Sequence, residues 1–351
     1  MTRLDKLRQL FTDDIDAYLV TDELNNRYLS EVDYTDGFLL ITREKAYLLA
    51  DSRYIEIAKK TADKQFEVRL LNDKRANIIQ AIVPVGSRIG YEDNNLTCSE
   101  LRSIETALDG YTFVPKGMMT ERLRNVKDEA EKELVIKAQR ITEGAFQYAL
   151  GIITPEMTEK ELALELEYHM RKHGADGISF DTIAVSGSSS SLPHGVPADK
   201  KLEKGFLTMD FGAKYKGYCA DMTRTVCIGK PDDEMRRLYD TVLEAQTAAI
   251  EYISAGKRCC DCDKVARDII DGAGYKGLFG HSLGHGVGFY IHESIHVSSK
   301  SEEVLENGNI ITAEPGIYIE GRYGVRIEDM LYVTHNGNEN LTKADKTLIV
   351  I

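Results

Sequence analysis

Two short stretches decide the fold of the C-terminal part of this chain, Asp210-Phe211-Gly212-Ala213 and Asp221-Met222-Thr223-Arg224-Thr225. Each lies in an apolar segment that reads as a strand, and the polar link 214–217 between them suits a hairpin turn. The sequence therefore predicts a β-hairpin with one carboxylate near the end of each arm.

The register of this hairpin determines whether the two carboxylates meet. If Tyr215-Lys216 is the loop, Asp210 and Asp221 face each other with Cβ atoms about 5 Å apart on one face. Two carboxylates at that separation repel each other, and a divalent cation between them would remove the repulsion. A solvated hairpin face explains this stretch equally well when it is taken alone.

The same arrangement occurs a second time. The apolar run 310–314 ends in Glu314, the segment 325–328 ends in Glu328, and Gly321 lies near the expected apex between them. This register places Glu314 opposite Glu328. Two hairpins with two acids each would supply four carboxylates, and two divalent ions would balance their charge.

Composition limits the classes of protein that the chain can belong to. It has 351 residues, enough for two or three domains, and a net charge of −13, which argues against nucleic acid or an anionic membrane as the main partner. The charged N-terminus has no signal-peptide core, and no apolar stretch approaches membrane-spanning length. We therefore expect a cytoplasmic protein.

Six cysteines are scattered along the sequence without the spacing of a disulfide framework. Cys259, Cys260 and Cys262 are close together, but a structural zinc site would need a second matching cluster. We interpret all six as reduced thiols.

Residues 1–120 are expected to form an α/β domain of their own. Helical spacing covers 4–11, 53–61 and 77–82, and strand patterns cover 17–21, 37–42, 46–50 and 66–71. This part holds no group of acids and histidines, so we interpret it as a packing or assembly domain. The second domain is expected to span 121–351.

The second domain shows signs of an internal duplication. Capping boxes at Asp128 and Thr158 predict helices running to about Ile152 and to just before Gly174. Further helices are expected over 231–254 and from about Asp263 to before Gly274. Two helix-helix-hairpin blocks would place the metal site on a pseudo-twofold axis between duplicated halves. The serine run 188–191 is expected to be a flexible loop.

Histidines cluster near the predicted carboxylates. His281, His285 and His292 fall within twelve residues, among glycines that allow close approach of the backbone. His194 lies in a loop before the first hairpin. A single histidine is usually structural, but three beside four acids indicate a functional site.

The motifs DFGA, ADMTRT, HSLGHGVG, AEPGIY and GVRIED, in this order, resemble the pita-bread metallopeptidases of the Xaa-Pro aminopeptidase and prolidase branch. The resemblance covers roughly 122–351, and segments 28–30 and 49–54 resemble a creatinase-type N-terminal domain more weakly. It implies an α/β (α+β) fold in which a smaller creatinase-type α/β domain precedes a C-terminal pita-bread domain.

The resemblance also implies a set of ligands. Asp210 would bind one metal ion, His285 and Glu314 the other, and Asp221 and Glu328 would bridge both. This oxygen-rich set favours Mn²⁺ or Co²⁺, with Zn²⁺ as a further candidate.

Roles for the remaining site residues follow from the resemblance in the same way. Glu314 would carry a proton to the leaving nitrogen, while His292 and His194 would bind the substrate carbonyls. His281 would line the cleft, and Tyr318 and Arg326 would support the site.

The main functional expectation is an Xaa-Pro aminopeptidase acting on short peptides with proline in second position. The resemblance also implies a homodimer. Prolidase activity on Xaa-Pro dipeptides is the alternative. More distant alternatives are a metal-free creatinase-like hydrolase or a peptide-binding protein, but the five ligand positions are filled. The separate N-terminal domain argues against a methionine aminopeptidase.

Overall fold

The computed structural model describes all 351 residues and divides into two compact units, 1–123 and 124–351. Each unit is described by itself. None of the helices is long and apolar enough to span a membrane.

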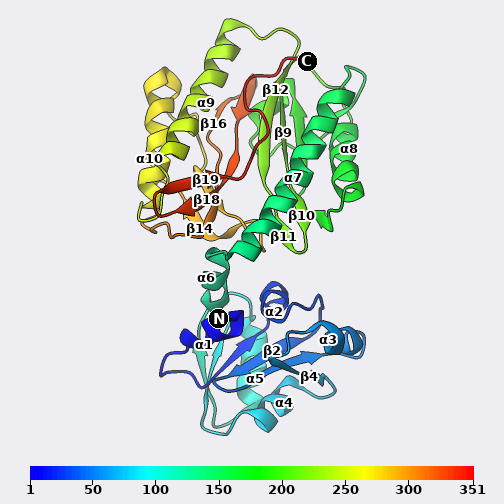
Figure 1. Ribbon diagram of the computed structural model, residues 1–351, viewed down its shortest axis with the longest axis vertical. Helices are drawn as coiled ribbons and strands as arrows, with labels where there is room; N and C mark the ends of the chain where they lie inside the picture. Colours follow the sequence, from blue (N-terminus) through cyan, green and yellow to red (C-terminus); the bar gives the residue numbers. More distant parts are fainter. The chain divides into compact units, whose positions relative to one another are not determined.

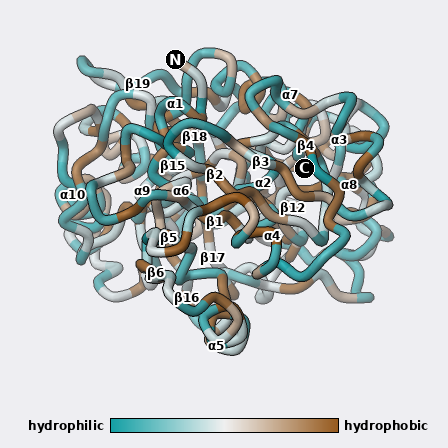
Figure 2. Tube along the Cα trace, turned by 90° about the horizontal axis from the view of Figure 1, so that it is seen from below, coloured by the Kyte–Doolittle hydropathy of each residue, from teal (hydrophilic) through white to brown (hydrophobic).

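The first unit is built on a six-stranded mixed sheet in the order β4-β3-β2-β1-β5-β6 (Figure 1). The strands β1–β3 pair antiparallel, whereas β4, β5 and β6 join in parallel. The trace of β1 is hydrophobic in Figure 2, as expected for a strand buried along its whole length. The strands are β1 Ala17–Val20, β2 Phe38–Thr42, β3 Ala46–Ala50, β4 Phe66–Leu70, β5 Arg88–Tyr91 and β6 Thr112–Pro115.

Short helices connect these strands. The predicted helices near residues 4–11, 53–61 and 77–82 are present, but two further helices, α2 and α5, were not expected. The helices are α1 Arg3–Gln9, α2 Glu23–Ser30, α3 Ile55–Thr61, α4 Arg75–Ile82 and α5 Cys98–Ala107, followed by α6 Met119–Asn125 across the boundary between the units.

A buried carboxylate fixes the start of α2. Glu92 follows β5, and its Oε2 accepts hydrogen bonds from the backbone N–H groups of Thr21 (2.6 Å) and Asp22 (2.8 Å). Its Oε1 accepts another from Asn25 Nδ2 at 2.8 Å. Burial outweighs these bonds and raises the pKa of Glu92 to about 7.

Replacement of Glu92 by Gln should flatten the pH dependence of stability. Because the folded-state pKa lies above the ordinary value of 4.5, the folded state binds more protons, and stability falls as pH rises from about 4.5 to 7. At about 1.4 kcal/mol per pKa unit, the effect is on the order of 3 kcal/mol. Denaturant unfolding of metal-free wild type and E92Q at pH 5 and pH 8 measures it. Equal pH slopes would contradict the prediction, and Glu56→Gln, at an exposed carboxylate, serves as the control.

The second unit consists of two helix-pair and strand blocks. In Figure 1, α7 and α8 cover the strands on one side, and α9 and α10 cover them on the other. The helices are α7 Glu129–Ile152, α8 Glu159–Lys172, α9 Asp233–Tyr252 and α10 Cys259–Ile270. Both predicted capping boxes are present, at Asp128 and Thr158. The helix α10 begins four residues before the predicted Asp263, at an N-cap, Arg258, that makes no side-chain capping bond.

The two blocks repeat local details, as the duplication hypothesis requires. The C-caps Ile153 and Ile253 adopt nearly the same backbone angles, and Gly174 and Gly274 both take positive φ values, 104° and 95°. Two hydrophobic cores fill this unit, one around α7 and α8 and the other around α9 and α10, and the second core also includes Phe206 and Cys227 from the strands of the first block.

The strands of the first block are β7 Gly177–Ile178, β8 Ile183–Ser186, β9 Gly205–Phe211, β10 Ala213–Tyr215, β11 Tyr218–Cys219 and β12 Met222–Ile228. The serine run was expected to be a flexible loop, but it forms a 3₁₀ turn, Gly187–Ser191. Ser190 is buried there and accepts a hydrogen bond from the N–H of Gly324 at 3.0 Å. The run is therefore an ordered part of the packing.

The strands of the second block are β13 Gly284–Gly286, β14 Glu293–Val297, β15 Ile310–Ala313, β16 Gly316–Ile319, β17 Tyr323–Arg326, β18 Asp329–Thr334 and β19 Gly337–Asn340. The register predicted for the second hairpin is confirmed. Ala313 pairs with Asp329, and Gly316 pairs with Arg326, so Glu314 and Glu328 lie opposite each other in the two interruptions between these pairs. Gly321, with φ 69°, lies at the apex.

The register predicted for the first hairpin is wrong. The turn is Lys216-Gly217, with φ 48° and 86°, rather than Tyr215-Lys216, and Asp210 pairs with Thr223. Both turn residues have positive φ, as a two-residue type I′ turn demands. Moving the turn by one residue shifts the partner of Asp210 by two, and two residues is the side-chain period of a strand. Asp221 therefore stays on the same face as Asp210, diagonally across the ladder.

Candidate metal centre and active site

Three of the four predicted metal carboxylates lie where the strands are interrupted. Asp221 stands between β11 and β12, Glu314 between β15 and β16, and Glu328 between β17 and β18. At such interruptions the side chains can leave the alternation of the strand and converge. Gly212 lies opposite the first interruption, where a Cβ atom would come within 1.8 Å of the carbonyl oxygen of Ala220, so this close approach requires glycine.

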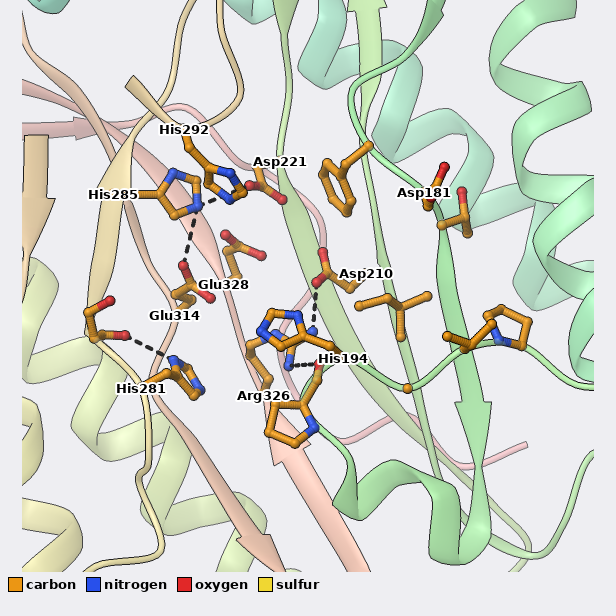
Figure 3. Close-up of a pocket in the computed structure, with 18 of the residues that line it drawn as sticks. Asp181, His194, Asp210, Asp221, His281, His285, His292, Glu314, Arg326 and Glu328 are labelled. Carbon is orange, nitrogen blue, oxygen red and sulfur yellow. Dashed lines mark hydrogen bonds and ion pairs between the residues drawn. The ribbon is translucent and has the colours of Figure 1, made fainter. Parts of the chain in front are cut away.

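The predicted ligands gather in one place. One ligand atom each of Asp221, His285 and Glu328 lies within 4.8 Å of the others. Glu314 Oε1 is 3.4 Å from His285 Nε2, and Asp221 Oδ2 is 3.5 Å from the same nitrogen. Figure 3 shows these side chains directed toward a common space, with Asp210 across that space from His285.

Backbone and hydroxyl groups orient these ligands. The Nδ1 of His285 lies 3.0 Å from the carbonyl oxygen of Gly286 and donates its proton there, which leaves the lone pair of Nε2 free to bind a metal ion on the side of the carboxylates. Thr223 Oγ1 donates to Glu328 Oε2 at 2.7 Å, and Thr312 Oγ1 donates to Glu314 Oε1 at 3.1 Å. The two threonines lie two residues from Asp221 and Glu314 on the same strand faces. That spacing is the sequence signal that could have identified them.

Electrostatics shows that the site fits cations. Burial raises the pKa of Asp221 to about 6 and that of Glu314 to about 7, and it raises the pKa of Glu328 well above its usual range, with Asp221 adding repulsion. Burial disfavours the charged form of His285, but the Asp221 and Glu314 carboxylates outweigh it and raise its pKa to about 9.

Asp210 gives a second indication that the site is suited to bind a cation. Its Oδ2 accepts a hydrogen bond from Arg326 at 2.6 Å, but its buried Oδ1 has no hydrogen-bond partner. A buried oxygen without a partner is costly unless a cation or another donor satisfies it. Four carboxylates and one imidazole are donors of the kind that Mn²⁺ and similar hard divalent ions bind.

Arg326 joins the site to its surroundings. Its Nε donates to Thr223 Oγ1 at 3.0 Å, and its NH1 donates to Tyr318 Oη at 2.7 Å and to the carbonyl oxygen of Pro193 at 3.1 Å. His281 Nε2 lies 3.0 Å from Tyr318 Oη, and its Nδ1 lies 2.9 Å from the carbonyl oxygen of Ser282. Burial lowers the pKa of His281 to about 4, so this imidazole is neutral and its Nε2 accepts a hydrogen bond from the Tyr318 hydroxyl.

The remaining predicted histidines border the same cavity, which has a volume of about 530 Å³. The rings of His292 and His285 are 4.5 Å apart, and burial lowers the pKa of His292. His194 is exposed on the loop that Arg326 holds through Pro193. All the predicted site residues except Tyr318 therefore line one cavity, and Tyr318 contacts two of them.

Sequence reasoning missed the other walls of this cavity. They are mostly apolar and come from the segments 180–183 and 193–197, with one residue each from two other segments; the residues are Phe180, Asp181, Thr182, Ile183, Pro193, Gly195, Val196, Pro197, Ser282 and His296. Most of them lie outside helices and strands, where apolar residues carry no periodic signal, so nothing in the sequence singles them out.

A cavity lined by four convergent carboxylates and histidines, between two related halves of an α/β unit, defines a metal-dependent hydrolase. Comparison with known proteins identifies the family. The chain belongs to metallopeptidase family M24, which matches residues 133–335, and residues 3–126 match the creatinase/prolidase N-terminal domain. The pita-bread fold with a creatinase-type N-terminal domain and the metal-dependent peptidase class, both expected from the sequence, are confirmed.

Relatives are similar over nearly the whole chain. The structure of an Xaa-Pro dipeptidase from Bacillus anthracis is 40% identical with a TM-score of 0.95, and the match covers 99% of both chains. An X-Pro aminopeptidase from Thermotoga maritima is 38% identical with a TM-score of 0.92, covering 99% of this chain and 100% of the other. An Xaa-Pro dipeptidase from Pyrococcus horikoshii is 37% identical over 95% of each chain.

Proposed function

We propose that the protein is an Xaa-Pro dipeptidase that uses two divalent metal ions. The observation that carries this proposal is the similarity to dipeptidases from Bacillus anthracis and Pyrococcus horikoshii over at least 95% of the chain. These relatives support the dipeptidase alternative better than the aminopeptidase that we expected as the main activity.

The proposed ligands are Asp210, Asp221, His285, Glu314 and Glu328. Bound divalent ions would supply Lewis-acid activation of the attacking water and of the scissile carbonyl. The oxygen-rich ligand set favours Mn²⁺ or Co²⁺ over Zn²⁺. Activity of the metal-free protein after addition of each ion separately tests this preference.

Glu314 is the proposed proton carrier. Its Oε1 lies 3.4 Å from His285 Nε2 on the wall of the cavity, beside the space that the attacking water and the scissile bond would occupy. During hydrolysis the water oxygen bonds to the carbonyl carbon and the C–N bond to proline breaks. Glu314 would take a water proton on a carboxylate oxygen and pass it to the proline nitrogen, which leaves as a secondary amine.

His292 and His194 would hold the substrate from opposite walls of the cavity. Neutral His292 can donate one N–H to a substrate oxygen, and His194 is exposed on a loop anchored by Arg326. Arg326 donates a hydrogen bond to the Tyr318 hydroxyl, and this hydroxyl donates to His281. The two bonds together would keep the Tyr318 hydroxyl fixed at the edge of the site.

The experiment is a substrate panel with Mn²⁺-loaded protein. We expect hydrolysis of Ala-Pro and Leu-Pro, and at most weak hydrolysis of Ala-Pro-Gly and of the non-proline dipeptide Ala-Gly. Glu314→Gln, purified in parallel, controls for contaminating peptidases. Failure to cleave any Xaa-Pro bond with Mn²⁺, Co²⁺ or Zn²⁺ would refute the proposal.

Xaa-Pro aminopeptidase activity is the second candidate, because the Thermotoga maritima relative carries that name at 38% identity. It predicts that Ala-Pro-Gly is cleaved after alanine as fast as Ala-Pro or faster. The same panel therefore separates the two activities.

A homodimer is proposed only by analogy with the family. Light scattering on the full chain should give twice the chain mass of 39.4 kDa. A mass of one chain would exclude it.

A further inference from the structure

Arg224 lies on β12 directly after Thr223 but points to the opposite face of the strand, away from the metal ligands. It is almost completely buried, with 2% of its surface exposed. A guanidinium has five N–H donors, and five acceptors surround this one. They are Asp345 O for Nε (3.0 Å), Thr223 O and Glu328 O for NH1 (3.0 and 2.6 Å), and Asp329 Oδ1 and Ala344 O for NH2 (2.8 and 2.9 Å).

These contacts matter most at Glu328. This residue stands between β17 and β18, where no ladder pairing holds its backbone. Its N–H donates to the carbonyl oxygen of Thr223 at 3.2 Å, and its own carbonyl oxygen accepts from Arg224 at 2.6 Å. Its carboxylate accepts from Thr223 Oγ1 at 2.7 Å. The backbone of Glu328 is thus held on both sides by residues 223 and 224.

The same guanidinium reaches the C-terminal segment of the chain. It binds the carbonyl oxygens of Ala344 and Asp345, while Lys346 Nζ donates to Asp329 Oδ2 at 2.9 Å. Asp329 is therefore shared between Arg224 and Lys346. Because Arg224 and Asp329 are both buried, loss of either partner leaves an uncompensated charge in the interior.

We propose that Arg224 is a positioning residue that fixes the backbone of Glu328 for metal binding and ties the segment Ala344–Lys346 to the metal centre. The inference rests on the ligand role proposed for Glu328, but not on the identity of the substrate. Lysine cannot replace Arg224, because an ammonium has three donors and no planar fork.

Metal binding to the Arg224→Lys variant tests the proposal. Metal-free full-length wild type and R224K are titrated with Mn²⁺, and free Mn²⁺ is measured by electron paramagnetic resonance. Outer-sphere partners of metal ligands typically change affinity by 10- to 100-fold, so the Kd of R224K should rise by about that factor. Saturating Mn²⁺ should restore most of its activity, which a general loss of folding would not allow.

Tyr239→Phe is the matched control. It removes the 3.1 Å hydrogen bond from Tyr239 Oη to the carbonyl oxygen of Lys346, so it loosens the same C-terminal segment without touching Glu328. Its Kd for Mn²⁺ should stay within about threefold of wild type, the change expected for loss of one ordinary hydrogen bond. A wild-type Kd for folded R224K, or an equal rise in Y239F, overturns the proposal.

A second variant covers the case in which R224K does not fold. Lys346→Met removes the bond from the partly exposed Lys346 ammonium to the buried Asp329 carboxylate, together with its 2.7 Å bond to Gln246, and leaves Arg224 in place. Because Asp329 is also the ion-pair partner of Arg224, loss of the Lys346 charge disturbs Arg224 in a way that Y239F does not, and we expect a rise in Kd of about three- to tenfold. An unchanged Kd for K346M would overturn the proposed link between the segment Ala344–Lys346 and the metal centre. If wild type itself bound no Mn²⁺, the proposed metal function would fail instead, which separates the two results.

Discussion

Replacement of Glu328 by Gln should strongly reduce hydrolysis and, in the metal-free protein, increase stability. Glu328 is buried among Asp221, Glu314 and Asp210, and its pKa is raised well above its usual range by burial and then by their charges. Without cations, the neutral amide removes one source of repulsion and still accepts the Thr223 hydrogen bond. We expect a gain of about 1–3 kcal/mol in the free energy of unfolding.

Added metal should make wild type more stable than E328Q, the reverse of the order expected for the metal-free proteins. At a concentration of 100 times the Kd, Mn²⁺ stabilises wild type by about 2.7 kcal/mol. E328Q lacks a proposed bridging ligand and should gain much less, while its kcat/KM falls on the order of 10³-fold.

Thermal unfolding with chelator and with Mn²⁺, together with Ala-Pro hydrolysis, measures both effects. Glu320→Gln, at an exposed carboxylate on the apex of the same hairpin, is the matched control and should behave like wild type. If metal-free E328Q were less stable than metal-free wild type, the assumed repulsion among the carboxylates would be wrong.

Replacement of Arg326 by Lys should lower kcat/KM by about 100-fold. The guanidinium contacts Asp210, Thr223, Tyr318 and the Pro193 carbonyl at once, and one ammonium cannot reach all four. Loss of these contacts would release both Asp210 and the loop that carries His194. A 100-fold loss corresponds to about 2.7 kcal/mol of transition-state stabilisation.

Steady-state kinetics on Ala-Pro under saturating Mn²⁺ measures the effect. Arg322→Lys lies on the same hairpin and has an exposed ion pair with Glu234, so it should change kcat/KM less than twofold. Equal activities for R326K and R322K would show that the contacts of Arg326 do not matter for hydrolysis.

Capping boxes helped to predict the long helices of the second unit but did not decide every helix. The boxes at Asp128 and Thr158 mark α7 and α8, whereas the start of α10 is four residues earlier than predicted, because its N-cap, Arg258, makes no side-chain capping bond. The missed helix α5 does begin with a capping box, Thr97 with Glu100, so its signal was present. The missed α2 is short and contains two asparagines, which are weak helix formers.

The metal-site residues were easier to predict than the register that presents them. The first register depended on Lys216, a non-glycine residue with positive φ, which sequence rules disfavour. The face of Asp221 was nevertheless predicted correctly, because the error was two residues long. The apolar cavity wall was not predictable, since its loop residues become neighbours only through the tertiary fold.

The proposed metal ligands come from both blocks of the second unit, which gives bound metal a mechanical consequence. Asp210 and Asp221 come from the block of α7 and α8, and His285, Glu314 and Glu328 come from the block of α9 and α10. An ion held by both sets would cross-link the two blocks, in addition to buried contacts such as the Arg224–Asp329 ion pair that already join them. Chelation would therefore remove the catalyst and also lower the melting temperature of this unit.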